Sequence, residues 1–222
     1  MIKILEILAF AVSTAAFGYG AFRLLDIKAP KYFHLYVCAA GCYMLEELWV
    51  IVNALLGNGS QDGLVTVRLL GAFGCLCFML SANMCAFDLA MDEGKDRKAK
   101  VLACIAPVVL LVLFVLYVFS PANTTPTAVN VIGFVSISPA LFASYFSLKH
   151  LLLPKDANSF LSVTKRIDIL VLVFFAANYV YPIAYLHFSK TVMGVYDLIL
   201  AGLFFGMIVL CVKGADKWKT LI

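Results

Sequence analysis

The chain has 222 residues, of which 64% are hydrophobic and only 14% charged, and its mean hydropathy is +0.99. A soluble domain is about half apolar and about a quarter charged, so no water-soluble core could absorb this excess of apolar side chains. This composition predicts that the protein lies in a lipid bilayer. We expect no nucleic-acid partner. At a net charge of +4, the placement of the charges matters more than their sum.

Seven apolar stretches are long enough for the roughly 20 residues that a membrane-spanning helix needs. In chain order they are 4–25, 32–56, 64–90, 101–119, 128–152, 167–188 and 192–212. They are continuous rather than alternating, which argues against barrel strands. We read the first stretch as a retained helix rather than a signal peptide, because Glu6 lies just inside it. The expected fold is an all-α integral membrane protein, with one seven-helix transmembrane domain over residues 1–222.

The positive charges are placed asymmetrically along this pattern. Fourteen of the seventeen Lys and Arg lie at the ends of the first, third and fifth stretches, just after them, or in the C-terminal tail, and the others are Lys3, Arg68 and Lys190. Loops on the cytoplasmic side of a membrane carry an excess of Lys and Arg. We therefore expect the N-terminus outside and the C-terminus in the cytoplasm, in a plasma membrane or a bacterial inner membrane.

The seven stretches permit a 3+1+3 division into two parallel triplets around a linker helix. "STAAF" at Ser13–Phe17 and "SPALF" at Ser138–Phe142 occupy corresponding first helices. Chance matching of apolar helices explains so short a likeness equally well. The layout is similar to that of the sugar-carrying SWEETs, of heptahelical sensor regions of bacterial kinases and of retinal opsins, and this likeness covers topology only. An opsin needs a lysine within the seventh helix, and none precedes Lys213 there.

The second stretch carries a polar stripe at helical spacing. The stripe consists of His34, Cys38, Cys42, Glu46, Trp49 and Asn53. We expect Glu46 to face the bundle interior, and Glu47, about 100° away, to border a neighbouring helix. Arg68 on the next stretch is the natural counter-ion for one of the two carboxylates. The alternative is that Arg68 snorkels to the outer headgroups.

Other polar and aromatic residues cluster at the same outer depth, around Pro182 and at the start of the last stretch. The predicted ligand-binding residues are Glu46, Trp49, Asn53, Arg68, Asn178, Tyr181, Tyr185 and Asp197. An acidic centre with aromatic walls suits a cation, an amine or a polar solute. The alternative is an outer aromatic belt with Asn and Asp at helix ends. The inner half is expected to be poorer in polar groups, with Asn83, Asp88 and Asp168 as exceptions.

Three functions fit this pattern. The first is a small polytopic transporter-like protein with an outward-facing polar pocket centred on Glu46. The second is a receptor or sensor that signals through a cytoplasmic partner, and the third is a structural subunit of a membrane complex or homo-oligomer. No Ser-His-acid set and no HExxH motif appears, so we expect neither an enzyme nor a metal site or other cofactor.

Overall fold

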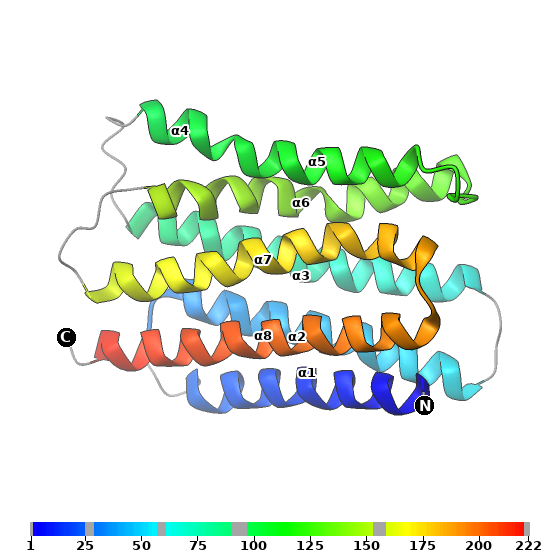
Figure 1. Cartoon of the computed structure of the whole chain (residues 1–222). Helices are drawn as coiled ribbons and strands as arrows, with labels where there is room; N and C mark the ends of the chain where they lie inside the picture. Colours follow the sequence, from blue (N-terminus) through cyan, green and yellow to red (C-terminus); the bar gives the residue numbers. More distant parts are fainter. Residues whose placement is uncertain (1, 25–28, 57–60, 90–96, 153–158, 220–222) are drawn as a thin grey trace.

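The computed structural model describes residues 2–24, 29–56, 61–89, 97–152 and 159–219, which form α-helices without any strand among them. The helices run side by side along one axis, and the two termini lie at opposite ends of the bundle (Figure 1). Their bounds are α1 Ile2–Leu24, α2 Lys31–Leu56, α3 Gln61–Leu89, α4 Arg97–Ala103, α5 Ile105–Val118, α6 Thr127–Leu152, α7 Ser159–His187 and α8 Lys190–Lys219.

Six stretches within the described residues are long and apolar enough to cross a membrane, which makes this a membrane protein. They are Ile4–Leu24, Lys31–Val52, Arg97–Val118, Thr127–Leu152, Val163–His187 and Lys190–Trp218. Within α3, Leu70–Cys85 forms a shorter apolar helix. Each of the seven predicted ranges overlaps helical residues, and six of them overlap a stretch long and apolar enough to span a membrane.

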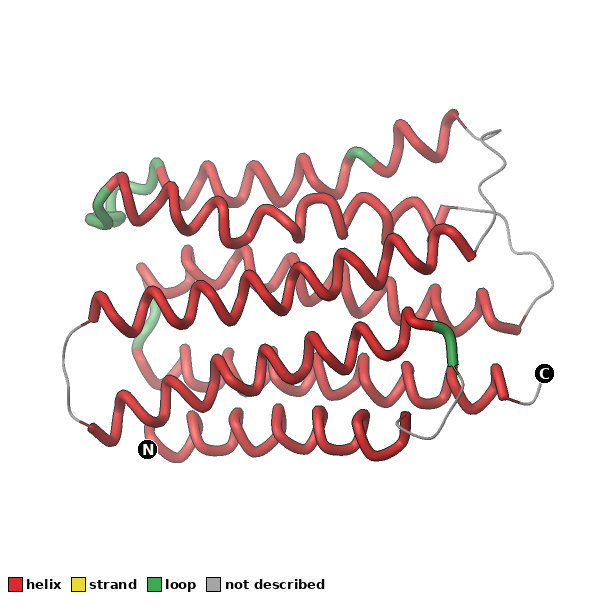
Figure 2. The backbone as a smooth tube through the Cα atoms, turned by 180° about the vertical axis from the view of Figure 1, so that it is seen from behind, coloured by secondary structure: helices red, strands yellow, loops and turns green. Residues whose placement is uncertain are grey.

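The predicted stretch 101–119 is not one uninterrupted helix. It begins at Arg97 and is broken at Cys104, which separates α4 from α5 (Figure 2). Pro107 explains the break, because it lacks the backbone N–H that would bond to Ala103 and its ring crowds that carbonyl. At the break, the Cys104 N–H donates to the Val101 carbonyl three residues back, at 3.2 Å, rather than to the carbonyl four residues back as in an α-helix.

Helix contacts arrange six of the helices in a closed ring. In spatial order the ring runs α1, α2, α3, α6, α7 and α8, and α8 packs against α1 again. Helices α4 and α5 lie outside the ring against α6 and α7, and in Figure 1 they run along one edge of the molecule. Most of the buried core therefore comes from the ring, and α5 adds Leu110 to it.

A second proline, Pro139, lies within α6 and is buried. Its missing N–H leaves the Val135 carbonyl without its usual helical donor. The Ser138 hydroxyl donates to that carbonyl at 2.8 Å. The helix thus continues past the proline because the preceding residue supplies the lost hydrogen bond.

Candidate functional site

Both glutamates of the second predicted stretch are buried in α2, with exposed fractions of 8% for Glu46 and 3% for Glu47. Glu47 lies one turn beyond Tyr43 on the same helix face, and the Tyr43 ring contacts rings on α7 and α8. Glu46 lies against α3 instead: a Cβ placed on Gly71 of α3 would be 3.0 Å from the Cβ of Glu46.

The expected orientation of the pair therefore needs correction. Glu47, not Glu46, shares the central face of α2, and Cys38 of the predicted polar stripe is exposed. The physical reason is that helical phase orders residues around a helix but does not identify the neighbour that each one meets. The two carboxylates remain about 100° apart, and each belongs to a different helix contact.

Two of the predicted residues, Tyr181 of α7 and Asp197 of α8, meet at the contact between those helices. The Tyr181 hydroxyl donates to the Asp197 carboxylate at 3.4 Å, and the Tyr196 hydroxyl donates to the Ala177 carbonyl at 2.9 Å. The Tyr181 and Tyr196 rings meet edge to face, with centroids 5.6 Å apart. Asn178 donates to the Phe174 carbonyl of its own helix at 2.9 Å. Tyr181, Tyr196 and Asp197 form a polar clasp between α7 and α8.

The remaining predicted residues are not gathered with that clasp. Tyr185 is 59% exposed on the bundle surface. Trp49 is half-buried, and its indole N–H has no hydrogen-bond partner among the described atoms. The side chains of Asn53 and Arg68 lie outside those that the structure describes, so the Glu–Arg68 pair stays a prediction.

Three buried rings form a layer at mid-length of the bundle. Tyr43 and Phe204 stack with centroids 5.2 Å apart and planes 5° apart. Phe174 meets Phe204 edge to face at 5.1 Å and Tyr43 at 6.0 Å. The rings come from α2, α7 and α8, and we refer to them as the aromatic layer. It separates the level of Glu47 and Asn178 from the inner half of the bundle.

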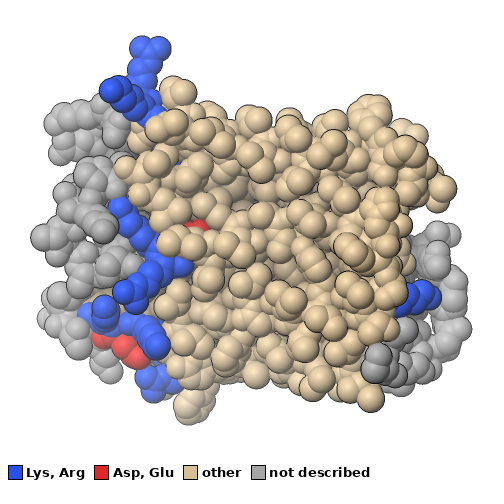
Figure 3. All heavy atoms as spheres, viewed as in Figure 1, with Lys and Arg blue, Asp and Glu red and all other residues tan. Residues whose placement is uncertain are grey.

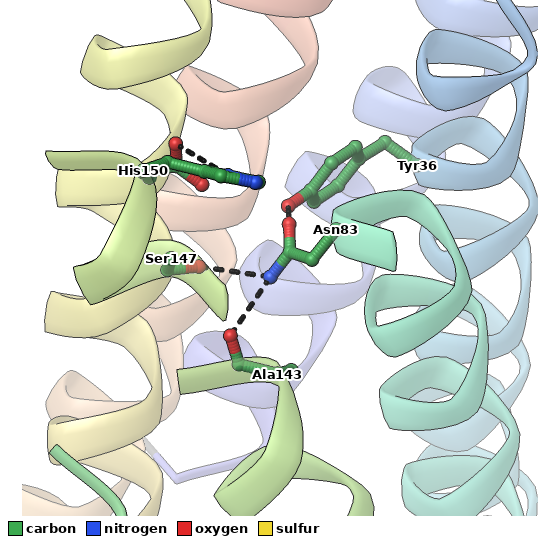
Figure 4. A network of polar contacts seen from close by, with 6 residues as sticks. Tyr36, Asn83, Ala143, Ser147 and His150 are labelled. Atoms are coloured by element: carbon green, nitrogen blue, oxygen red, sulfur yellow. Dashed lines mark hydrogen bonds and ion pairs between the residues drawn. The ribbon is translucent and has the colours of Figure 1, made fainter. Parts of the chain in front are cut away.

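A polar network lies on the other side of the aromatic layer, toward the end that holds the C-terminus. The Tyr36 hydroxyl donates to Asn83 Oδ1 at 2.7 Å, and Asn83 Nδ2 donates to Ser147 Oγ at 2.8 Å and to the Ala143 carbonyl at 3.1 Å (Figure 4). Tyr36, Asn83 and Ser147 are each 0% exposed. One amide thus joins α2, α3 and α6.

A buried acid–base pair extends this network to α7. His150 Nδ1 lies 3.3 Å from Asp168 Oδ2, and their side chains are 4% and 0% exposed. His150 follows Ser147 by three residues, so both lie on one face of α6. Charged groups are rare and costly inside a membrane, and they mark functional sites by default. Among the described residues, no three His, Cys, Asp or Glu side chains converge as metal ligands would.

The inner half thus holds more buried polar groups than the expected exceptions alone. Asn83 and Asp168 were recognised in the sequence as polar exceptions, but Tyr36, Ser147 and His150 were missed. Asn83 lies 47 residues from Tyr36 and 64 from Ser147, and Asp168 lies on a different helix from His150, so no local spacing reveals these partners. The available signal was the Ser147–His150 spacing on one face of an otherwise apolar helix. Asp88 lies outside the described side chains.

Charge is distributed unevenly over the two ends of the bundle. Ten of the eleven Lys and Arg with described side chains lie at the end that holds the C-terminus, and Lys190 lies at the other end. Figure 3 shows this gathering at one end of the visible face, with an uncharged band between the ends.

Comparison with protein-family models, with curated proteins and with solved structures gives no match to this chain. The case for its function therefore depends on the two buried polar groups and the aromatic layer between them.

Proposed function

We propose that this protein is a small transporter-like membrane protein that binds a cation, an amine or a polar solute in a pocket open to the outside. The observation that carries the proposal is the pair of polar levels separated by the aromatic layer. On α2, Glu47 lies four residues from Tyr43 and Tyr36 lies seven residues away on the other side. These separations are about 6 Å and about 10 Å along the helix axis.

The proposed membrane topology has seven crossings, with α4 and α5 forming one and α3 another. The N-terminus is outside and the C-terminus is cytoplasmic, in a plasma membrane or a bacterial inner membrane. The gathering of Lys and Arg at the C-terminal end supports this direction, because cytoplasmic ends carry the excess of positive charge.

The pattern of helix contacts supports the 3+1+3 repeat. If α1, α2 and α3 are matched in order with α6, α7 and α8, every pair of helices in contact around the ring corresponds to another pair in contact. The α1–α2 contact corresponds to α6–α7, α2–α3 to α7–α8, and α3–α6 to α8–α1. Transporters built from parallel repeats bind their substrates between the two repeats near the membrane midplane.

In the proposed mechanism, the carboxylates of Glu46 and Glu47 hold the cation or take up a proton, and Arg68 is the counter-ion of the empty site. Trp49, Asn53, Asn178, Tyr181 and Asp197 border the path by which the solute enters. The solute passes to the level of Asn83 and His150 when the Tyr43–Phe204 stack separates. Pro139 and Pro182 lie within the helices that bend.

The test is flux through the purified full chain in liposomes. We expect uptake of radiolabelled methylammonium, with a change of lumenal pH that a trapped dye reports. Glu47→Gln removes the central carboxylate and should reduce uptake about tenfold or more. Asp216→Asn is the matched control, because Asp216 is exposed and pairs with Arg23 at 3.1 Å on the surface. Its uptake should equal that of the unaltered chain.

The other two functions are outcomes of the same experiment. Saturable binding of methylammonium without flux would indicate the receptor or sensor, whose effector would co-purify from the membrane. Neither binding nor flux, with Glu47→Gln changing only the recovery of a larger complex, would indicate a structural subunit or homo-oligomer. Equal flux in both variants would refute the role assigned to Glu47.

A further inference from the structure

A cavity lies far from the aromatic layer, where α5 ends and α6 begins. Its volume is about 380 Å³. Ligand pockets have volumes of about 300–1,000 Å³, so this cavity is large enough for a small molecule or one lipid chain. It lies at the end of the bundle opposite the Lys- and Arg-rich end, between two helices at the edge of the molecule (Figure 1). We call it the α5–α6 pocket.

The lining of the α5–α6 pocket changes from apolar to polar along the helix axes. Its apolar wall is Phe114, Val118, Val131 and Phe134, and the Phe114 and Phe134 rings lie 5.2 Å apart. Both rings lie about one to two turns inside the helix ends. The polar lining consists of Asn123, Thr125, Thr127 and Asn130, all in the connection or in the first turn of α6. A membrane amphiphile has the same order of apolar and polar parts.

The polar rim is held in place by its own hydrogen bonds. Asn123 Nδ2 donates to the Tyr117 carbonyl at 3.2 Å, and Asn123 Oδ1 accepts from the Thr125 N–H at 2.9 Å. The Tyr117 and Thr125 hydroxyls lie 3.3 Å apart. Asn130 Nδ2 donates to the Thr125 carbonyl at 3.3 Å, and its Oδ1 is buried with no hydrogen-bond partner among the described atoms. A rim of Asn and Thr side chains suits a headgroup that both donates and accepts hydrogen bonds, as a hydroxyl does.

We propose that the α5–α6 pocket binds a neutral, single-chain amphiphile whose headgroup carries a hydroxyl. The aliphatic chain lies along Phe114 and Phe134, and the hydroxyl lies at the polar rim beside Asn123, Thr125 and Asn130. No Lys, Arg, His, Asp or Glu is among the residues that line the pocket, which disfavours a charged headgroup because the charge would be left without a partner. This site is independent of the transport proposal.

The experiment uses the full chain in lipid nanodiscs and a monoacylglycerol with a photoreactive diazirine in its chain. After irradiation, labelled peptides are located by mass spectrometry. We expect labels concentrated between Phe114 and Phe134. Unlabelled monoacylglycerol should displace the label about tenfold better than a fatty acid of the same chain length. A short-chain alcohol added from water serves as a further competitor.

Two variants test the pocket itself. Val131→Trp fills it and should lower labelling about tenfold. Val135→Trp is the matched control, because Val135 is 56% exposed one turn farther along α6 and does not line the pocket. Asn130→Leu keeps the shape but removes an amide from the polar rim, and it should abolish the preference for the glycerol ester over the fatty acid.

Displacement by monoacylglycerol alone assigns a membrane lipid as the ligand, whereas equal displacement by the short-chain alcohol assigns a water-borne one. Both results support a hydroxyl-bearing amphiphile. The proposal is overturned if labels are spread evenly over the lipid-facing helices, if Val131→Trp labels as strongly as Val135→Trp, or if the fatty acid competes equally with the ester.

Discussion

Replacement of Asn83 by Leu tests whether the inner polar network holds the helices together. Asn83 is fully buried and makes three hydrogen bonds to groups on α2 and α6. Leu has nearly the shape of Asn but neither donor nor acceptor, so the substitution removes these bonds without opening a cavity. The change in stability therefore reports the network itself.

The size of the effect follows from the number of bonds. Hydrogen bonds between membrane helices contribute on average about 0.6 kcal/mol each and at most about 1.7 kcal/mol. Three of them give about 2–5 kcal/mol. The Tyr36 and Ser147 hydroxyls would also lose a buried partner, which adds to the penalty. We expect Asn83→Leu to lower the free energy of unfolding by about 3 kcal/mol.

The measurement is reversible unfolding by SDS in mixed micelles, followed by the fluorescence of the two tryptophans. Ser81→Ala is the matched control, because Ser81 is exposed on the same helix and its hydroxyl bonds only one turn back, to the Cys77 carbonyl at 2.8 Å. A double-mutant cycle of Asn83→Leu with Tyr36→Phe should give a coupling of about 0.6–1.7 kcal/mol. If Asn83→Leu destabilises no more than Ser81→Ala, or if the coupling is zero, the network does not stabilise the bundle.

Two further substitutions test close packing and the proline of α6. Gly214→Ala should destabilise the protein by about 1–3 kcal/mol, since a Cβ there would lie 2.7 Å from the Phe33 ring. A Cβ on Gly133 would have nothing within 4 Å, so Gly133→Ala should stabilise the protein by up to about 1 kcal/mol. Equal unfolding midpoints for the two variants would contradict the contact between Gly214 and Phe33. Ser138→Ala should cost about 1 kcal/mol because the Val135 carbonyl loses its donor, and Ser138→Thr, which keeps the hydroxyl, should cost less in the same assay.

The helices were predictable because an apolar run of about 20 residues in a membrane protein has few alternatives to a helix. The ends of the helices were less predictable. Helix α7 begins at Ser159, eight residues before the apolar range 167–188, because hydropathy does not detect polar helical turns that lie outside the hydrocarbon. The break at Cys104 had a signal in Pro107 that the apolar pattern concealed.

The site was only partly predictable, and the reason is the number of helices that build it. Tyr181 and Asp197 lie close in sequence on consecutive helices, and the structure joins them as their common depth indicated. Tyr36, Asn83 and Ser147 come from three helices, and each looks like an isolated polar residue in its own helix. Which helices become neighbours depends on the packing of the whole ring, and one sequence does not disclose that order.

The position of α4 and α5 outside the ring has a consequence for chain connectivity. Helices α3 and α6 pack directly against each other, so the segment that joins them in sequence contributes nothing to the ring contacts. It serves as a tether that keeps the two halves at a high effective concentration. Two separately synthesised fragments, one ending after α3 and the other beginning before α4, should therefore find each other in the membrane and rebuild the same interior.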